Sequence, residues 1–96
     1  MHARLVTMTL GPGMRDKATG LADASLALNR TLPGFVSATY LIFDEAAGEY
    51  GSLSVWKSVE AANAAAEKLR PWLEENAGAM LRSPAAVRLA EVYEPQ

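Results

Sequence analysis

The two ends of the chain carry short segments in which β-forming residues alternate between two faces. Residues 3–10 place Val6, Met8 and Leu10 on one side and contain no Gly or Pro. Residues 86–93 alternate in a similar way. Because successive side chains of a strand point to opposite faces, both segments are predicted to be strands.

A β-hairpin is the clearest local feature of the sequence. Residues 35–43 and 49–56 are rich in β-branched and aromatic residues. The turn between them ends in Gly48, a residue that tolerates the backbone angles of a tight connection. The pattern therefore predicts two antiparallel strands joined by that turn.

Helical periodicity fills most of the remaining chain. Apolar or small residues recur at steps of three and four over residues 14–32, and Pro33 ends the helix that they predict. Ser58 is predicted to cap a second helix that begins at Val59. Pro71 suits the first turn of a helix, so a further short helix is predicted to begin there.

The predicted order is strand, helix, two hairpin strands, helices and a last strand. This is the βαββαβ order of ferredoxin-like α+β folds, with a four-stranded antiparallel sheet and helices on one face. The other face needs a cover, because residues 35–43 are apolar on both sides, whereas a sheet face exposed to water is normally polar. We therefore expect a homodimer, in which a second copy closes over the sheet by two-fold symmetry to make a dimeric α/β barrel.

Composition narrows the classes of function. Ninety-six residues, 50% of them apolar, suit one folded domain over residues 1–96. The net charge is −2 without a basic stripe, which argues against nucleic-acid binding. No apolar stretch approaches the roughly 20 residues of a membrane span. The absence of cysteine excludes disulfides and thiolate metal sites and suits a cytoplasmic protein.

Acid–base, nucleophilic and metal chemistry has few candidates. His2 is the only histidine and adjoins the N-terminus, where a general base would lack support. Glu74 and Glu75 are adjacent and so point in different directions on a helix, and no pair of His, Asp or Glu has the spacing of metal ligands. The sequence therefore predicts no metal site.

Aromatic residues are better candidates for a binding site. A pocket for a flat apolar ligand could be lined by Tyr40, Tyr50, Trp56, Trp72 and Phe43. One register of the hairpin groups the two tyrosines and Trp56 on one face with neighbouring serines, but a slip of one residue would scramble the grouping. Packing as core or interface anchors is the plainer interpretation of Trp56 and Trp72.

Asn63 is the amide of most interest, because it lies beside the apolar stripe of the second predicted helix. A buried amide needs a hydrogen-bond partner, which a ligand could supply. Solvation at the edge of the stripe is the commoner alternative.

Four short motifs between residues 33 and 94 carry a resemblance that covers nearly the whole chain. They are Pro33-Gly34-Phe35, Trp56-Lys57-Ser58, Val59-Glu60-Ala61-Ala62 and Val92-Tyr93-Glu94. Together with the order of elements, they resemble the antibiotic biosynthesis monooxygenase-like family of dimeric α/β barrels. The resemblance implies a homodimer with a pocket between the sheet and the helices of each subunit. Some members oxidise polycyclic aromatic molecules with O₂ and without metal or flavin, and others degrade haem.

The haem-degrading members are a poor match. They use an Asn on the first strand and a Trp and a His around the second helix, where this chain has Thr7 or a neighbour, Ala65 and roughly Glu75. Many relatives also carry a His nine positions after the Trp, and Ala65 occupies that position here. Haem degradation is therefore not expected.

Two functions stay open from the sequence. The first is a cofactor-independent monooxygenase, or a related isomerase or cyclase, acting on an aromatic or polyketide-like small molecule. In such an enzyme Tyr40, Trp56 and Asn63 would orient the substrate and hydrogen-bond to a developing oxyanion. The remaining ligand-binding residues would be Tyr50, Trp72 and Phe43. The second function is a non-catalytic homodimer that binds a small molecule or serves in a stress response, which the shortage of His, Cys and paired acids supports.

Overall fold

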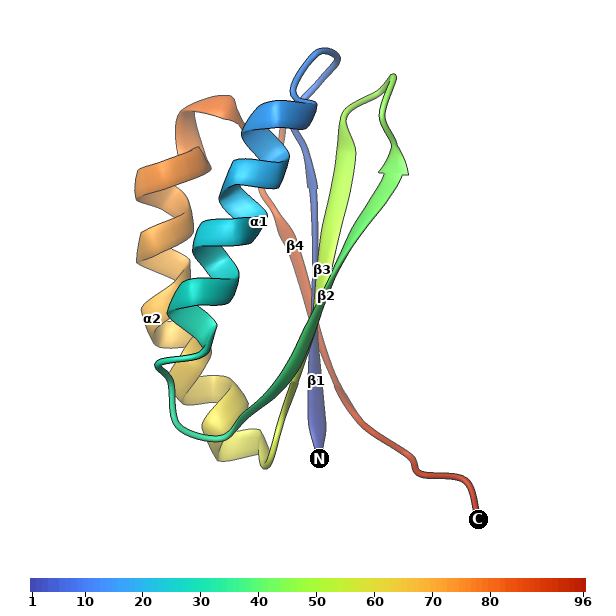
Figure 1. The fold of residues 1–96 in the computed structure, drawn as a ribbon, viewed down its shortest axis with the longest axis vertical. Coiled ribbons are helices and arrows are strands. Elements are labelled where there is room, and N and C mark those ends of the chain that lie inside the picture. The colour runs from blue at the N-terminus through green and yellow to red at the C-terminus, as the bar shows by residue number, and fades with distance from the viewer.

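The computed structural model describes residues 1–96 as one sheet with two helices on a single face (Figure 1). Along the chain the elements are β1 (His2–Thr9), α1 (Arg15–Asn29), β2 (Phe35–Asp44), β3 (Glu49–Trp56), α2 (Val59–Ala77), a 3₁₀ turn (Gly78–Met80) and β4 (Ala86–Glu91). This order confirms the predicted α+β, ferredoxin-like class.

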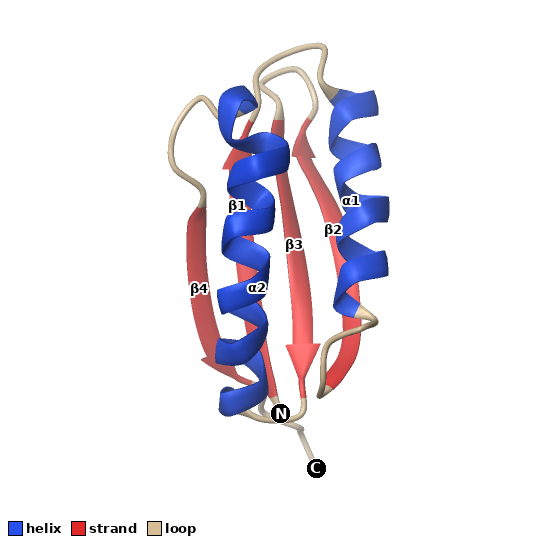
Figure 2. Ribbon diagram, turned by 90° about the vertical axis from the view of Figure 1, so that its left-hand side faces the viewer, coloured by secondary structure: helices blue, strands red, loops and turns tan.

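The four strands pair antiparallel in the order β2-β3-β1-β4, so that β1 and β3 are the two central strands. Viewed from the helix side, α2 lies in front of β1 and α1 lies along the β2 side of the sheet (Figure 2). The opposite face of the sheet carries no helix (Figure 1).

The register between β2 and β3 decides which side chains face the helices. Tyr40 lies opposite Ser52, and Ile42 lies opposite Tyr50. Directly opposed residues point to the same face of a sheet, and residues two apart on a strand share that face. The structure therefore has the register that groups Tyr40, Tyr50 and Trp56 on one side, and this side faces the helices.

Two irregularities interrupt β2, one between Phe35 and Ser37 and one between Ile42 and Asp44. A bulge of this kind inserts an extra residue and re-aims the side chains beside it. The first brings Phe35 opposite Trp56, where the two rings meet edge to face with centroids 5.4 Å apart.

The core gathers around Trp56, which is fully buried. The indole packs with Ala62, Ala65 and Leu69 of α2, and Leu28, Leu32 and Phe35 close the cluster from the side. Alanines on the inner side of α2 let this helix lie close to the ring, because a larger side chain would need the same space.

The ends of the helices follow local chemistry. Ser58 Oγ accepts a hydrogen bond from the backbone N–H of Ala61 at 3.1 Å, which confirms the predicted cap of α2. α1 ends at Asn29, earlier than predicted, and the N–H groups of Thr31 and Leu32 donate to carbonyls one turn back in a tight exit.

The prediction that a separate helix begins at Pro71 is wrong, because α2 runs unbroken through it to Ala77. Proline has no N–H to donate to the carbonyl of Glu67, and it costs about 3 kcal/mol in a helix interior. Leu69 and Trp72, on either side of it, are buried or half-buried against the sheet. Packing of this kind supplies most of the stability of a helix in a protein, so the proline is tolerated.

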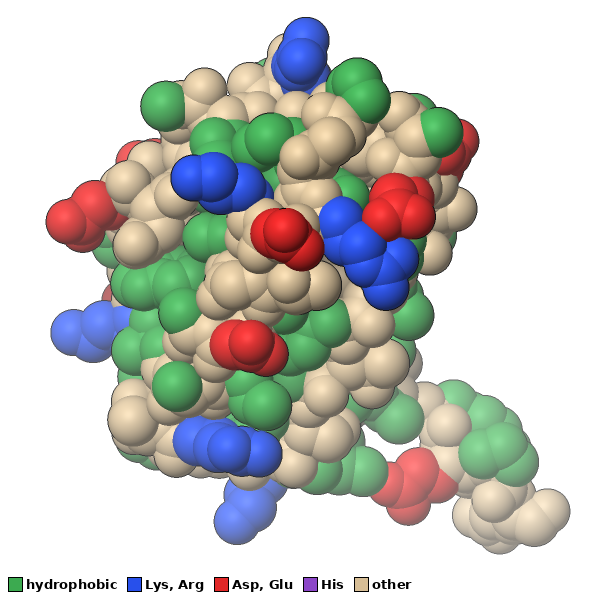
Figure 3. Space-filling view, turned by 45° about the horizontal axis from the view of Figure 1, so that its top comes forward, with side chains coloured by type: hydrophobic (Ala, Val, Ile, Leu, Met, Phe, Trp, Pro, Cys, Tyr) green, Lys and Arg blue, Asp and Glu red, His purple; other side chains and the backbone are tan.

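One ion pair lies on the surface, and no helix is suited to cross a membrane. Arg15 Nη1 and Glu45 Oε1 lie 3.2 Å apart and join the start of α1 to the hairpin turn. On the face drawn in Figure 3, charged side chains of both signs are scattered among apolar and neutral ones, and one basic side chain adjoins an acidic one. No helix combines the length and hydrophobicity needed to cross a bilayer.

We expect Gly34→Ala to lower the free energy of unfolding by about 1–3 kcal/mol. Gly34 has a φ of +79°, and a Cβ at this position would lie 2.6 Å from the Cβ of Ala61. Urea denaturation measures the change. Gly20→Ala is the matched control, because nothing lies within 4 Å of an added Cβ there, and it should gain up to about 1 kcal/mol of helix stability. Equal stability of the two variants would contradict the close approach at Gly34.

Candidate functional site

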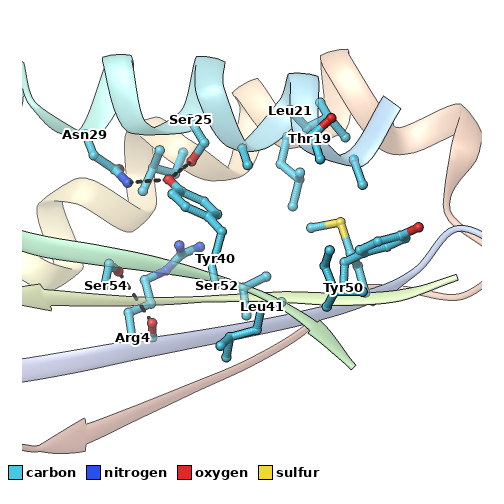
Figure 4. Close-up of a pocket in the computed structure, with 18 of the residues that line it drawn as sticks. Arg4, Thr19, Leu21, Ser25, Asn29, Tyr40, Leu41, Tyr50, Ser52 and Ser54 are labelled. Carbon is cyan, nitrogen blue, oxygen red and sulfur yellow. Dashed lines mark hydrogen bonds between the residues drawn. The ribbon is translucent and has the colours of Figure 1, made fainter. Parts of the chain in front are cut away.

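A cavity of about 240 Å³ lies between the helix-facing side of the sheet and the helices (Figure 4). Nineteen residues line it, of which twelve are hydrophobic. They come from both helices and from β1, β2 and β3. The volume is just below the range of about 300–1,000 Å³ that is typical of ligand pockets, so a small aromatic system of a few rings suits it.

Apolar side chains form most of the wall. Val6 and Met8 of β1, Leu21 of α1 and Leu69 and Leu73 of α2 all line the cavity. Covering these side chains with a flat hydrocarbon ring breaks few hydrogen bonds to water. Burial of the apolar surface of that ring is favourable by about 25 cal/mol per Å².

Tyr40 is held upright in the cavity by two residues of α1 (Figure 4). Its hydroxyl donates to Ser25 Oγ at 3.0 Å and accepts from Asn29 Nδ2 at 3.3 Å. Ser25 and Asn29 are four residues apart and so lie on the same side of the helix. Both hydrogen bonds fix the ring of Tyr40 as a wall of the cavity.

A second set of linked hydrogen bonds lies on the sheet side of the cavity. Trp56 Nε1 donates to Ser54 Oγ at 2.9 Å, and this hydroxyl donates to the backbone carbonyl of Arg4 at 3.4 Å. Ser54 lines the cavity, whereas Trp56 does not. The indole therefore influences the cavity by holding the hydroxyl of Ser54.

Three lining residues have buried polar atoms without a hydrogen-bond partner. They are Arg4 Nε, Asn29 Oδ1 and the hydroxyl of Tyr50. Such atoms are rare, because an unpaired buried donor or acceptor costs about 1–3 kcal/mol. Burial lowers the pKa of the Arg4 guanidinium, and the positive charge of Arg70 lowers it further. All three residues line the cavity, so its wall includes polar side chains that the protein itself pairs only in part or not at all.

No family model and no curated protein matches the chain. Solved structures do match it. The monooxygenase from the gene ActVA-Orf6 of Streptomyces coelicolor, solved in complex with the ligand nanaomycin D, superposes with a TM-score of 0.78 at 24% identity, over 99% of this chain and 89% of that one.

Two further structures are similar. SnoaB, a cofactor-independent oxygenase from Streptomyces nogalater, gives a TM-score of 0.70 at 20% identity, over 98% of this chain and 95% of that one. A candidate antibiotic biosynthesis monooxygenase from Nitrosomonas europaea gives 0.82 at 10% identity, over 98% and 91%. The chain has the fold of the antibiotic biosynthesis monooxygenases. At these identities the likeness concerns the fold, and the motifs of the sequence pointed to it correctly.

Within this monooxygenase fold, three of the six predicted site residues line the cavity: Tyr40, Tyr50 and Trp72. The other three lie elsewhere. Trp56 is in the core, Asn63 is exposed on α2, and Phe43 is 53% exposed near the end of the hairpin.

Sequence reasoning missed Arg4 and Ser25 as site residues and preferred Asn63 to Asn29, although each of the three left a signal. Arg4 lies two residues before Val6 in the apolar series of the first strand. Ser25 lies on the core stripe of the first helix, with Asn29 one turn later. A polar residue in an apolar series is buried with it, and must then find a partner. The structure brings no group of three or more His, Cys, Asp or Glu side chains together as metal ligands.

Tyr40→Phe is expected to lower the free energy of unfolding by about 1–3 kcal/mol, because it leaves Asn29 Nδ2 without its acceptor inside the fold. Urea denaturation followed by tryptophan fluorescence measures this loss. Tyr93→Phe removes the same atom from a side chain that is 80% exposed, and it should leave stability unchanged. If both variants unfold like the wild type, the hydroxyl of Tyr40 is not part of a buried network.

Proposed function

We propose that this chain is a cofactor-independent monooxygenase that acts on a flat aromatic or polyketide-like small molecule. The observation that carries the proposal is the cavity, which is mainly apolar and has polar atoms placed at a few points of its wall. The fold adds support, since SnoaB is described as a cofactor-independent oxygenase and the ActVA-Orf6 protein as a monooxygenase with a bound ligand.

The chemistry needs only the substrate and O₂. An anthrone has a methylene group whose proton is acidic, because the two flanking rings and the carbonyl delocalise the resulting anion. The anion supplies the electrons that reduce O₂. One oxygen atom replaces the two methylene hydrogens as a new carbonyl, and the other leaves with those hydrogens as water. The balance is CH₂ + O₂ → C=O + H₂O, and no external reductant enters.

The protein contributes orientation and a dry environment. Tyr40, fixed by Ser25 and Asn29, is a rigid wall against which a ring can lie. The hydroxyl of Tyr50 has no partner within the protein, and in this proposal it donates to the substrate oxygen on which negative charge develops. Trp72 adds a further aromatic wall. Trp56 acts as a positioning residue through Ser54. Neither Asn63 nor Phe43 has a role in this proposal.

A second candidate is a binding protein without turnover. One observation favours it: the ionisable residues that line the cavity are Arg4, Tyr40 and Tyr50, and none is a His, Asp, Glu or Lys that readily removes a proton near neutral pH. The same walls would then hold an aromatic ligand without converting it.

Aerobic incubation with a panel of hydroxylated anthrones separates the two functions. An oxygenase should consume one O₂ per anthrone and form the corresponding quinone, as an oxygen electrode and absorbance would record. Tyr50→Phe should lower kcat by about tenfold to hundredfold, because it removes one donor to the developing oxyanion. Tyr93→Phe is the control and should be unchanged. Saturable binding with flat oxygen traces would favour the binding protein, and absence of both would reject both.

We also propose that residues 1–96 form one domain that works as a homodimer. The helix-free face of the sheet is apolar: Leu53 is 38% exposed there, with Leu5, Leu41 and Val55 on the same side by register. Phe43, near the hairpin end, lies close to Gly51 of that face. A second copy presenting the same surface would remove this area from water, as isologous pairing allows.

Light scattering at micromolar concentration should give the mass of two chains. Leu53→Glu should shift the protein toward single chains, because it would bury a carboxylate in the interface. Ala27→Glu changes an exposed residue on the helix side, and should leave the mass unchanged. A wild-type protein with the mass of one chain would overturn the dimer.

A further inference from the structure

Arg4 is a cation placed where a core residue would be expected. It is 7% exposed, lies on β1 in series with Val6 and Met8, and lines the cavity with them. Its guanidinium rises from the sheet toward Tyr40 and α1 (Figure 4). An arginine that only covers apolar surface would keep its charged end in water. Here the side chain ends inside.

No carboxylate compensates this charge. The ion pair of the structure joins Arg15 to Glu45 at the surface. The residues that pair with Arg4 across the sheet, Ser54 and Leu89, are neutral. The charged group that acts on Arg4 is Arg70, which has the same sign and, together with burial, lowers the pKa of Arg4. A guanidinium stays protonated at neutral pH, so the cavity holds a positive charge that the protein itself leaves unpaired.

Two further unpaired atoms restrict the ligand. The hydroxyl of Tyr50 can donate a hydrogen bond, and Asn29 Oδ1 can accept one. Both residues line the same cavity as Arg4. The site therefore offers a cation at one end and a phenol at the other, because Tyr50 pairs with Met8, four residues along β1 from Arg4 (Figure 4). Asn29 adds an amide oxygen that can accept from a hydroxyl or N–H group.

We propose that the cavity binds an aromatic molecule carrying an anionic oxygen, a carboxylate or an ionised phenol, and that Arg4 receives this oxygen. The inference deepens the proposed function by naming the charge of its ligand, and it depends on that function only for the location of the ligand. Arg4 is thus a binding residue that selects for charge.

Binding of matched probes tests the proposal. The probes are a naphthalene carboxylate, the carboxamide of the same ring, and a dinitronaphthol whose phenol is ionised at neutral pH. Calorimetry on the full chain should give at least about tenfold tighter binding of the carboxylate than of the carboxamide, because a charge-assisted bond to Arg4 is stronger than a neutral one. The dinitronaphthol shows whether an ionised phenol serves as well as a carboxylate.

Variants locate the effect. Arg4→Met keeps the length of the side chain and should abolish the preference for the carboxylate, and Arg4→Lys should restore part of it. Arg15→Met removes an equal charge from the surface ion pair, and should leave the preference unchanged. Equal binding of carboxylate and carboxamide by the wild type would overturn the proposal, as would a preference that survives in Arg4→Met.

Thermal unfolding supplies a readout that a structural arginine would not give. Without ligand, Arg4→Met should melt several degrees higher than the wild type, because it removes an uncompensated buried charge. The carboxylate should raise the Tm of the wild type and not that of the variant. A lower Tm in Arg4→Met would mean that the guanidinium has a stabilising partner in the fold, which contradicts the proposal.

The outcomes also separate this inference from the oxygenase. Charge-selective binding through Arg4 with flat oxygen traces would retain the anion site and reject turnover. Oxygen uptake on neutral anthrones without any preference for anions would retain the oxygenase and reject the role of Arg4.

Discussion

The antiparallel pairing of β3 with β1 and β2 is the constraint on which the cavity depends. β3 is held between two neighbours, so its alternation decides which side chains meet the helices. In the observed register the helix side receives Tyr50, Ser52 and Ser54, and the other side receives Leu53 and Val55. A slip of one residue would exchange these sets and fill the cavity with aliphatic side chains. The polar lining is therefore a consequence of strand pairing.

The buried polar side-chain atoms that lack a partner all belong to residues that line the cavity. The cap at Ser58 and the indole N–H of Trp56 both have partners. Unpaired buried atoms occur on Arg4, Asn29 and Tyr50, and all three residues line one cavity. Most buried polar groups in proteins pair with other protein groups or with ordered water, and functional sites are among the places where exceptions are expected. The local loss of stability around this cavity is what a site for a polar, aromatic ligand would cost.

The two faces of the sheet differ in what they carry. The helix-facing side carries the cavity, and the helix-free side carries an apolar surface that includes Leu53. This division explains why β2 lacks the clean alternation of a sheet with one wet face. Side chains on one side of the strand lie under the helices, and those on the other side would be covered in the proposed homodimer.

The sequence by itself determined the order of elements and the class of fold. Alternation at period two, helical spacing and turn residues are local properties, and they located every strand and the start of α2 at Val59 correctly. Short motifs such as Pro33-Gly34-Phe35 reflect local geometry too, since Gly34 has a positive φ. These signals survive without knowledge of the neighbours in space.

Only the tertiary structure decided what surrounds each side chain. Pro71 stays inside α2 because packing on the sheet outweighs its local cost. Asn63 and Tyr40 are both candidate hydrogen-bonding residues in the sequence. In the structure Asn63 faces solvent, whereas the hydroxyl of Tyr40 donates to Ser25, which lies 15 residues away along the chain. Arg4 likewise forms no ion pair with an acidic side chain, which its place in the sequence does not reveal. Partners that are far apart along the chain are chosen by strand register and helix docking, and a local pattern holds no record of them.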